Sequence, residues 1–159
     1  MGFFDFLNRK KSPSDPIDRI KQRWLYLSDG LIKDNYSSKI NHYGSRFSTN
    51  GFETWFLGLE QRLGQSLGRR LAHAALEHQE FFLKNSGVKS PSSRDPKNWT
   101  ENTLDWQTRG LGLYSKLEDE DEVRLLVESP ASSAICSGLL TSTWEVATTK
   151  RHRFVWSQS

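Results

Sequence analysis

The stretch over 109–156 limits the fold of this chain more than any other. Apolar residues alternate with polar ones over 111–117 and again over 123–127, and residues 129–146 carry apolar side chains at helical spacing. A period of two is typical of strands, and a period of three to four is typical of helices. These patterns predict a hairpin, a helix and then a last strand over 151–156. We interpret the acidic run between the hairpin strands as a solvated turn, because it lacks the spacing of a calcium loop.

The chain as a whole fits one domain of mixed helix and sheet. Its 159 residues lie within the usual size of a single domain. Six Trp, nine Phe and four Tyr supply a large core, although only 35% of the residues are hydrophobic. We therefore predict an α+β fold in which N-terminal helices and a long central helix pack on a small antiparallel sheet. The expected parts are a flexible aromatic and basic segment over 1–14 and a single α+β domain over 15–159. Within the domain we expect an N-terminal helix and loop over 15–50, the central helix over 52–84, a loop over 85–98 and a strand–strand–helix–strand unit over 109–157.

Two stripes of apolar residues predict the helices that precede the sheet. Asp15 and Pro16 form a typical helix start, and apolar residues at helical spacing follow them, so we expect a helix over 16–34. The longest stripe runs over 52–82 and predicts the central helix. A third, shorter helix is expected over 99–107.

Three small residues at a spacing of four, Gly64, Gly68 and Ala72, lie on the predicted central helix. A glycine inside a helix costs roughly 1 kcal/mol relative to alanine, so two of them indicate a need for close approach. We expect another helix to pack tightly on this ridge, either from the same chain or from a second copy in a homodimer. Contact with a ligand is the alternative role for the same residues.

Few residues offer reaction chemistry. Cys136 is the only cysteine, so the chain alone forms neither a disulfide nor a cysteine-based zinc site. His73 and His78 lie five residues apart, which turns them toward different faces of a helix. The sequence motifs of phosphate loops, dinucleotide folds, zinc proteases and serine hydrolases are absent. We expect no catalytic residue, no metal and no cofactor, and an enzyme ranks behind a binding protein as a hypothesis.

Charge and hydropathy restrict the partners. The net charge is +3, but Lys and Arg are interleaved with Asp and Glu, so we expect no nucleic-acid partner. Near the start, Phe3, Phe4 and Phe6 precede a run of cations, a composition typical of weak docking to a membrane surface or a partner protein. No apolar run reaches the roughly 18 residues that span a bilayer, and the first segment lacks the pattern of a secretory signal. We expect a cytoplasmic protein.

Short motifs in a fixed order suggest a family. The motifs are Leu59-x3-Leu63-Gly64-x2-Leu67-Gly68-Arg69-x-Leu71, then Gly110-Leu111-Gly112, then Glu128-Ser129-Pro130, and finally Ser137-Gly138-Leu139-Leu140-x3-Trp144-Glu145. Their order resembles the 4-vinyl reductase domain over about residues 52–157. That family is a small-molecule-binding α/β fold, distantly similar to transport-particle tethering subunits and to haem–nitric-oxide sensors. Members often bind a metal through cysteines, of which only Cys136 is present here. The resemblance therefore implies a metal-free pocket between the central helix, the last helix and the hairpin.

Two hypotheses of function follow. The first is a non-catalytic small-molecule-binding or sensory domain, whose pocket takes an apolar or aromatic ligand. The second is a protein-interaction or scaffolding protein that dimerises through the small-residue ridge and docks a partner or membrane surface through its Phe-rich start. The candidate pocket residues are Trp55, Leu59, Trp106, Leu111, Cys136, Leu140, Trp144 and Glu145.

Some of these pocket assignments have a rival. Each tryptophan, taken singly, is more often plain core than a ligand contact. Glu145 follows Trp144 on an otherwise apolar helix, and a buried carboxylate there could hydrogen-bond a ligand. For Glu145 we favour an ion pair with Arg151 or Arg153 on the adjacent last strand.

Overall fold

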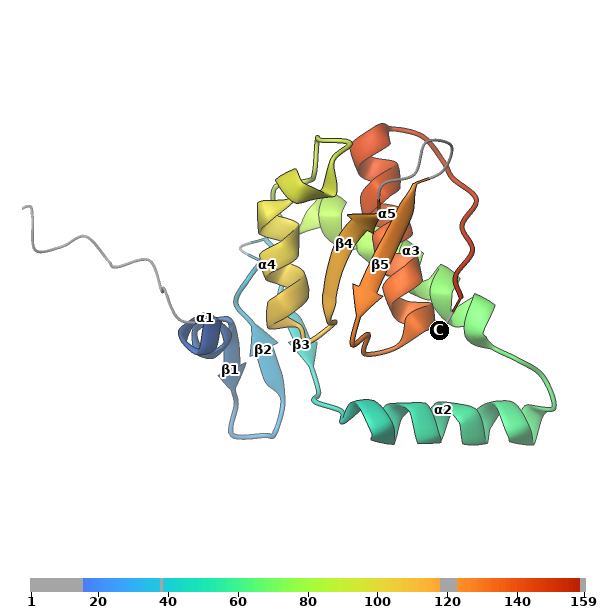
Figure 1. Ribbon diagram of the computed structural model, residues 1–159. Coiled ribbons are helices and arrows are strands. Elements are labelled where there is room, and N and C mark those ends of the chain that lie inside the picture. The colour runs from blue at the N-terminus through green and yellow to red at the C-terminus, as the bar shows by residue number, and fades with distance from the viewer. Residues whose placement is uncertain (1–15, 38, 118–122, 158–159) are drawn as a thin grey trace, which may run out of the picture.

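An α+β architecture with two small antiparallel sheets is seen in the computed structural model, which describes residues 16–37, 39–117 and 123–157 (Figure 1). The predicted fold class is confirmed. In chain order the elements are α1 (Pro16–Arg23), β1 (Trp24–Tyr26), β2 (Ile32–Asp34), β3 (His42–Gly44), α2 (Thr49–Leu63), α3 (Gly68–Asn85), the short 3-10 helix η1 (Pro96–Asn98), α4 (Thr100–Thr108), β4 (Leu113–Leu117), β5 (Arg124–Glu128) and α5 (Ser133–Thr148).

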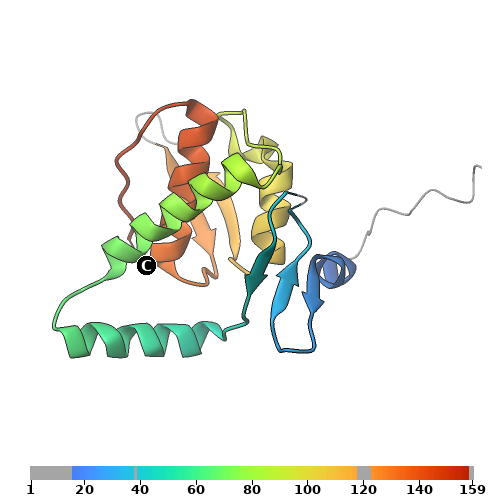
Figure 2. The same cartoon turned by 180° about the vertical axis from the view of Figure 1, so that it is seen from behind.

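The core is built around α5, which lies between α3 on one side and the β4–β5 hairpin on the other (Figures 1 and 2). Eleven of its sixteen residues are buried. A helix covered on both sides carries no single apolar stripe, because nearly every face meets protein. The buried residues that form the main apolar cluster are Ala75, Trp99, Trp106, Leu111, Cys136, Leu139, Leu140 and Ala147.

Close packing of two helices occurs where α3 crosses α5. A Cβ placed on Gly138 would lie 2.0 Å from the backbone oxygen of Ala72 and 3.0 Å from the Cβ of Ala75. Only glycine leaves room for the backbones to approach this far. The expectation of tight helix packing on small residues is met at Ala72, but its partner is Gly138 and the contact lies within one chain.

The predicted hairpin is confirmed, with Leu113 paired to Glu128 and Leu117 to Arg124. Its acidic turn lies outside the described residues. The helix that follows begins at Ser133, after the N-cap Ser132, four residues later than the expected start at Ser129. The hairpin and α5 are therefore where the sequence pattern places them, within a few residues.

The expected helix over 16–34 is wrong beyond Arg23. The chain instead forms an antiparallel sheet in the order β1–β2–β3. Asp29 and Gly30 turn the chain between β1 and β2: Gly30 has a φ of 83°, and Asp29 Oδ1 accepts a hydrogen bond from the amide of Leu31. An Asp–Gly pair between apolar residues is a strong hairpin signal, and here it overrides the helical spacing.

A buried ion-pair cluster attaches this sheet to α4. Arg23 donates from Nε and Nη2 to the two carboxylate oxygens of Asp34, at 2.9 and 2.6 Å, and its Nη1 lies 2.8 Å from Asp105 Oδ1. The guanidinium also lies against the rings of Trp24 and Tyr36, at 4.7 and 4.5 Å from their centroids. Buried charges are tolerated when they are paired in this way. The cluster has a structural role, since the Arg23 guanidinium is engaged with two carboxylates of its own chain.

The single central helix expected over 52–84 is wrong, because the chain breaks between α2 and α3. Gly64 ends α2 in the left-handed conformation, with a φ of 64°, which glycine adopts at little cost. Glu60 then stabilises the corner, as its Oε1 accepts from the amide of Leu67 at 2.6 Å and from Ser66 Oγ at 3.1 Å. Gly64 and Gly68 therefore flank a turn, and the predicted ridge of Gly64, Gly68 and Ala72 does not exist on one helix.

The last strand expected over 151–156 is also wrong. This segment pairs with neither sheet and runs alongside α3 (Figures 1 and 2). The ring of Phe154 lies 5.8 Å from that of His73, and Arg151 forms an ion pair with Glu80 on α3. Alternation alone does not make a strand, because a strand needs a partner edge for its backbone hydrogen bonds.

Candidate functional site

Five of the eight candidate pocket residues are brought together by the fold. Trp106, Leu111, Cys136 and Leu140 belong to the buried cluster, and Trp144 packs against it. Their side chains fill the space between them: Cys136 is 1% exposed, and its Sγ lies 3.4 Å from the carbonyl oxygen of Leu111. Burial raises the pKa of the Cys136 thiol, which keeps it protonated and unreactive. These residues form core packing around α5.

Trp55 and Leu59 are not part of that group. Both lie on α2, which contributes no buried residue to the fold. The side chain of Trp55 is 61% exposed. The predicted pocket joined them to the other residues only because α2 and α3 were expected to form one helix.

Glu145 is buried and already paired within the chain. Its carboxylate accepts from Arg151 Nη1 at 2.8 Å and from the backbone amide of His152 at 2.8 Å. The preferred reading, an ion pair with Arg151, is confirmed, although Arg151 lies on an irregular segment. Glu145 thereby holds the C-terminal segment against α5.

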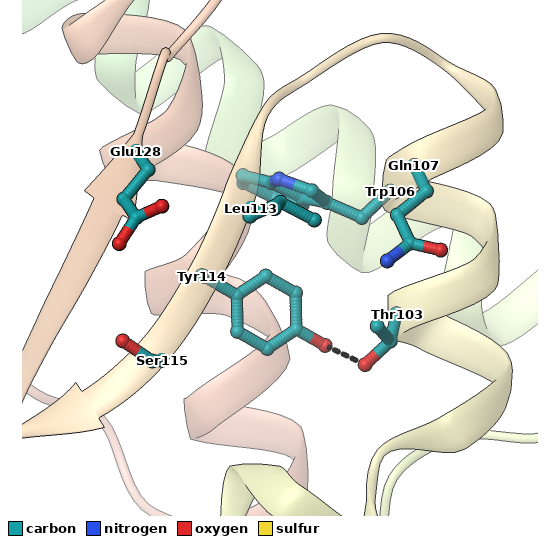
Figure 3. A pocket seen from close by; sticks show the side chains of 7 residues that line it. All are labelled: Thr103, Trp106, Gln107, Leu113, Tyr114, Ser115 and Glu128. Carbon is teal, nitrogen blue, oxygen red and sulfur yellow. Dashed lines mark hydrogen bonds between the residues drawn. The ribbon is translucent and has the colours of Figure 1, made fainter.

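A groove of about 280 Å³ lies between α4 and the β4–β5 hairpin (Figure 3). The Tyr114 hydroxyl and Thr103 Oγ1 meet across it at 2.8 Å. The indole nitrogen of Trp106, a residue that is 4% exposed, has no hydrogen-bond partner among the described residues. The side chains that line the groove are Thr103, Trp106, Gln107, Leu113, Tyr114, Ser115 and Glu128.

Sequence reasoning found only Trp106 among these lining residues. The others come from α4, from both faces of β4 and from the last residue of β5, because the groove lies at the edge of the hairpin. Strand alternation assigns residues to a face of a sheet and does not show which helix covers its edge. The signal that the sequence did offer is that the short helix directly precedes the hairpin in the chain, which places the two close together.

A second surface is the apolar side of α2. Phe52, Trp55, Phe56, Leu59 and Leu63 recur at helical spacing, and we call these five residues the α2 stripe. Their aromatic rings pack on one another, with centroids of Phe52 and Phe56 5.9 Å apart and nearly parallel. The helix stands apart from the body along its length in both views (Figures 1 and 2).

Both ends of α2 are well formed. Ser48 caps its start by accepting from the amide of Gly51 at 3.0 Å, and Gly64 caps its end. An isolated helix of about 12–15 residues is marginal in water even when its sequence is favourable. A capped helix of 15 residues with an apolar stripe and no buried residue is therefore incomplete by itself.

Phe3, Phe4 and Phe6 lie outside the described residues. Over the residues that are described, no set of three or more His, Cys, Asp or Glu side chains is arranged to hold a metal ion. Within the same ranges, none of the helices combines the length and the apolar character needed to cross a bilayer.

Comparison of the chain with protein-family models, with curated proteins and with solved structures finds no match.

Proposed function

We propose that this chain is a protein-interaction or scaffolding domain that docks through the α2 stripe. The observation that carries the proposal is that α2 is capped at both ends and has an apolar side, yet has no buried residue. Apolar surface of this kind marks a binding face when it is contiguous. The core around α5 and the ion pairs of Arg23 and Glu145 are formed without any residue of α2, which leaves the stripe available to a partner.

The charges on α2 favour a protein partner over a lipid surface. The polar side of the helix carries Glu53, Glu60 and Arg62. Helices that lie on membranes are rich in Lys and Arg on their polar side, because they face anionic lipid. With two carboxylates and one guanidinium, α2 lacks that attraction.

Site-specific photo-crosslinking tests this proposal. A photoreactive aromatic amino acid at position 55 samples the α2 stripe, and the same amino acid at position 57 is the matched control. Leu57 is 54% exposed and points away from the stripe on the same helix. We expect protein adducts from position 55 and few from position 57. Adducts to lipid alone, or equal yields at both positions, would contradict docking through the stripe.

A second candidate function is binding of an apolar or aromatic small molecule in the groove between α4 and the hairpin. The observation that favours it is the unpaired indole nitrogen of Trp106, since buried donors without a partner are rare in folded proteins. The nitrogen is shielded from solvent, so neighbouring side chains must shift before an acceptor atom of an aromatic ligand, seated beside the hydroxyls of Thr103 and Tyr114, can accept from it.

Native mass spectrometry tests the second candidate. We expect the purified chain to retain a small molecule, and Gln107→Trp, which fills the groove from its exposed rim, to lose it. A chain that carries no added mass, and whose Gln107→Trp variant is indistinguishable from it, would contradict this candidate.

A further inference from the structure

We propose that a second copy of this chain covers the α2 stripe, with the two α2 helices packed antiparallel about a two-fold axis. This inference rests on the proposed interaction function and names its partner. It replaces the homodimer expected from the small-residue ridge, which the break at Gly64 removes. The spacing, the sizes and the flanking charges of the stripe support this pairing.

The spacing of the stripe is that of a helix-pairing seam. Phe52, Phe56, Leu59 and Leu63 lie four, three and four residues apart. This is the alternation that directs one line of side chains toward a partner helix in a coiled coil. The 15 residues of α2 extend over about 22 Å, enough for four layers of contact.

The sizes along the seam are self-complementary in one direction only. In an antiparallel pair, Phe52 meets Leu63 of the second copy, and Phe56 meets Leu59 of the second copy. Each of the four layers then holds one phenylalanine and one leucine, which fills space evenly. A parallel pair in register instead stacks Phe on Phe twice and Leu on Leu twice, so that its first half is crowded and its second half is loose.

The residues beside the seam favour the same direction. Trp55 and Arg62 lie on one flank, and antiparallel pairing sets each tryptophan near the Arg62 guanidinium of the second copy, twice by symmetry. A guanidinium over an indole ring is a favourable cation–π contact. On the other flank, the carboxylate of Glu53 approaches that of Glu60 of the second copy. Their repulsion is limited, because Glu60 already accepts hydrogen bonds from Leu67 and Ser66 of its own chain.

The exposed area of the stripe suits a weak, concentration-dependent association. A tryptophan offers roughly 150–250 Å² for burial, so 61% exposure leaves about 90–150 Å² on Trp55 alone. Leu63 is 52% exposed, whereas Phe52, Phe56 and Leu59 are half-buried, so the stripe side chains of two copies offer a total somewhat below about 1,000 Å², the size of a weak, reversible interface. Two-fold pairing of one patch with itself is also the commonest arrangement in homodimers.

Sedimentation velocity across a range of protein concentrations tests the dimer. We expect the full chain to be a dimer and Phe56→Ser to raise the dimer dissociation constant at least about tenfold, since a buried aromatic anchor is lost. Leu57→Ser, which changes an exposed leucine on the other side of the same helix, should leave it within about twofold. A monomer at every concentration would overturn the inference, as would equal effects of the two substitutions.

Disulfide trapping tests the direction. Phe56→Cys and Leu59→Cys are made in separate samples, with Cys136 as the only other thiol and buried in both. An antiparallel pair predicts that the mixed sample forms a disulfide between positions 56 and 59 faster than either sample forms one with itself. Faster trapping within the single samples would overturn the antiparallel arrangement. Protein adducts from position 55 that contain only other proteins would overturn self-association and leave the interaction function standing.

Discussion

The contact of α3 with α5 at Gly138 makes a sharp prediction about stability. In Gly138→Ala, the added Cβ would lie 2.0 Å from the backbone oxygen of Ala72. That is about 1.4 Å closer than ordinary van der Waals contact, which begins near 3.4 Å. A carbonyl oxygen cannot rotate out of the way as a side chain does. The two helices must therefore separate, and the cluster between α5 and its neighbours loosens with them.

The expected loss is about 2 kcal/mol in the free energy of unfolding. Overpacking a core typically costs roughly 1–3 kcal/mol, and contact with backbone places this case toward the upper end. The same substitution stabilises the helix by roughly 0.5–1 kcal/mol, because alanine favours the helix more than glycine does, and this offsets part of the loss. For a domain of this size each kcal/mol shifts the melting temperature by roughly 2–4 °C, so we expect a fall of about 4–8 °C. Thermal and urea unfolding followed by circular dichroism measure both quantities.

The same substitution on α2 is the control. A Cβ on Gly58 would have no neighbouring atom within 4 Å. Gly58→Ala should therefore keep or raise the stability, by up to roughly 1 kcal/mol. If Gly138→Ala is as stable as the unchanged chain, the close crossing of α3 and α5 is incorrect and the core must be arranged differently.

Three further predictions concern the charged and titratable groups. Asp34→Asn leaves the buried Arg23 guanidinium short of a counter-charge and should lower the free energy of unfolding by about 3–5 kcal/mol in urea denaturation; a loss below about 1 kcal/mol would mean that water reaches the pair. Burial, with a contribution from nearby Asp105, raises the pKa of Tyr36 to about 12. Because the folded chain holds this proton more tightly than the unfolded chain, the stability it contributes is complete below pH 10 and is lost as the pH rises toward 12. Ultraviolet titration should show a late tyrosine step that denaturation abolishes, and ionisation of all four tyrosines near pH 10 would contradict it. Glu145→Gln removes the ion pair that holds the C-terminal segment, so trypsin should cleave after Arg151 faster than in the unchanged chain; equal cleavage would show that other contacts hold the segment.

Local patterns predicted the parts of the fold that depend on neighbours in the chain. The β4–β5 hairpin follows from alternation on both sides of one turn, and its strands pair as expected. The ion pair of Glu145 with Arg151 is equally local, since the two residues lie six apart. Both could be predicted because the interacting groups are close in sequence, so few alternatives compete.

The break between α2 and α3 could not be predicted from periodicity. Leu63, Leu67 and Leu71 continue at a spacing of four straight through the turn, so the stripe shows no interruption. What decides the break is the left-handed Gly64 together with the carboxylate of Glu60, which accepts from the amide of Leu67. A glycine inside an apolar stripe fits both a helix interior and a helix end, and only the capping contacts distinguish them.

Long-range contacts explain the other differences. Arg23 is buried because Asp105, 82 residues further along, supplies a second carboxylate. The sequence near Arg23 gives no sign of that partner. The apolar residues after it keep helical spacing, so the Asp29–Gly30 turn signal was the one local indication of a sheet. The groove was not predicted for the same reason. Which side chains of α4 and β4 face each other depends on how the whole hairpin packs against the helix, and no local pattern gives that arrangement.

Hydrogen exchange of the α2 amides, measured over a range of protein concentrations, tests the central claim most directly. If α2 is completed by association, its backbone amides over 49–63 should exchange slowly in concentrated samples and faster on dilution, while the amides of α5 stay protected throughout. Exchange of the α2 amides at the rate of an unfolded peptide at every concentration would contradict the claim that a partner covers this helix.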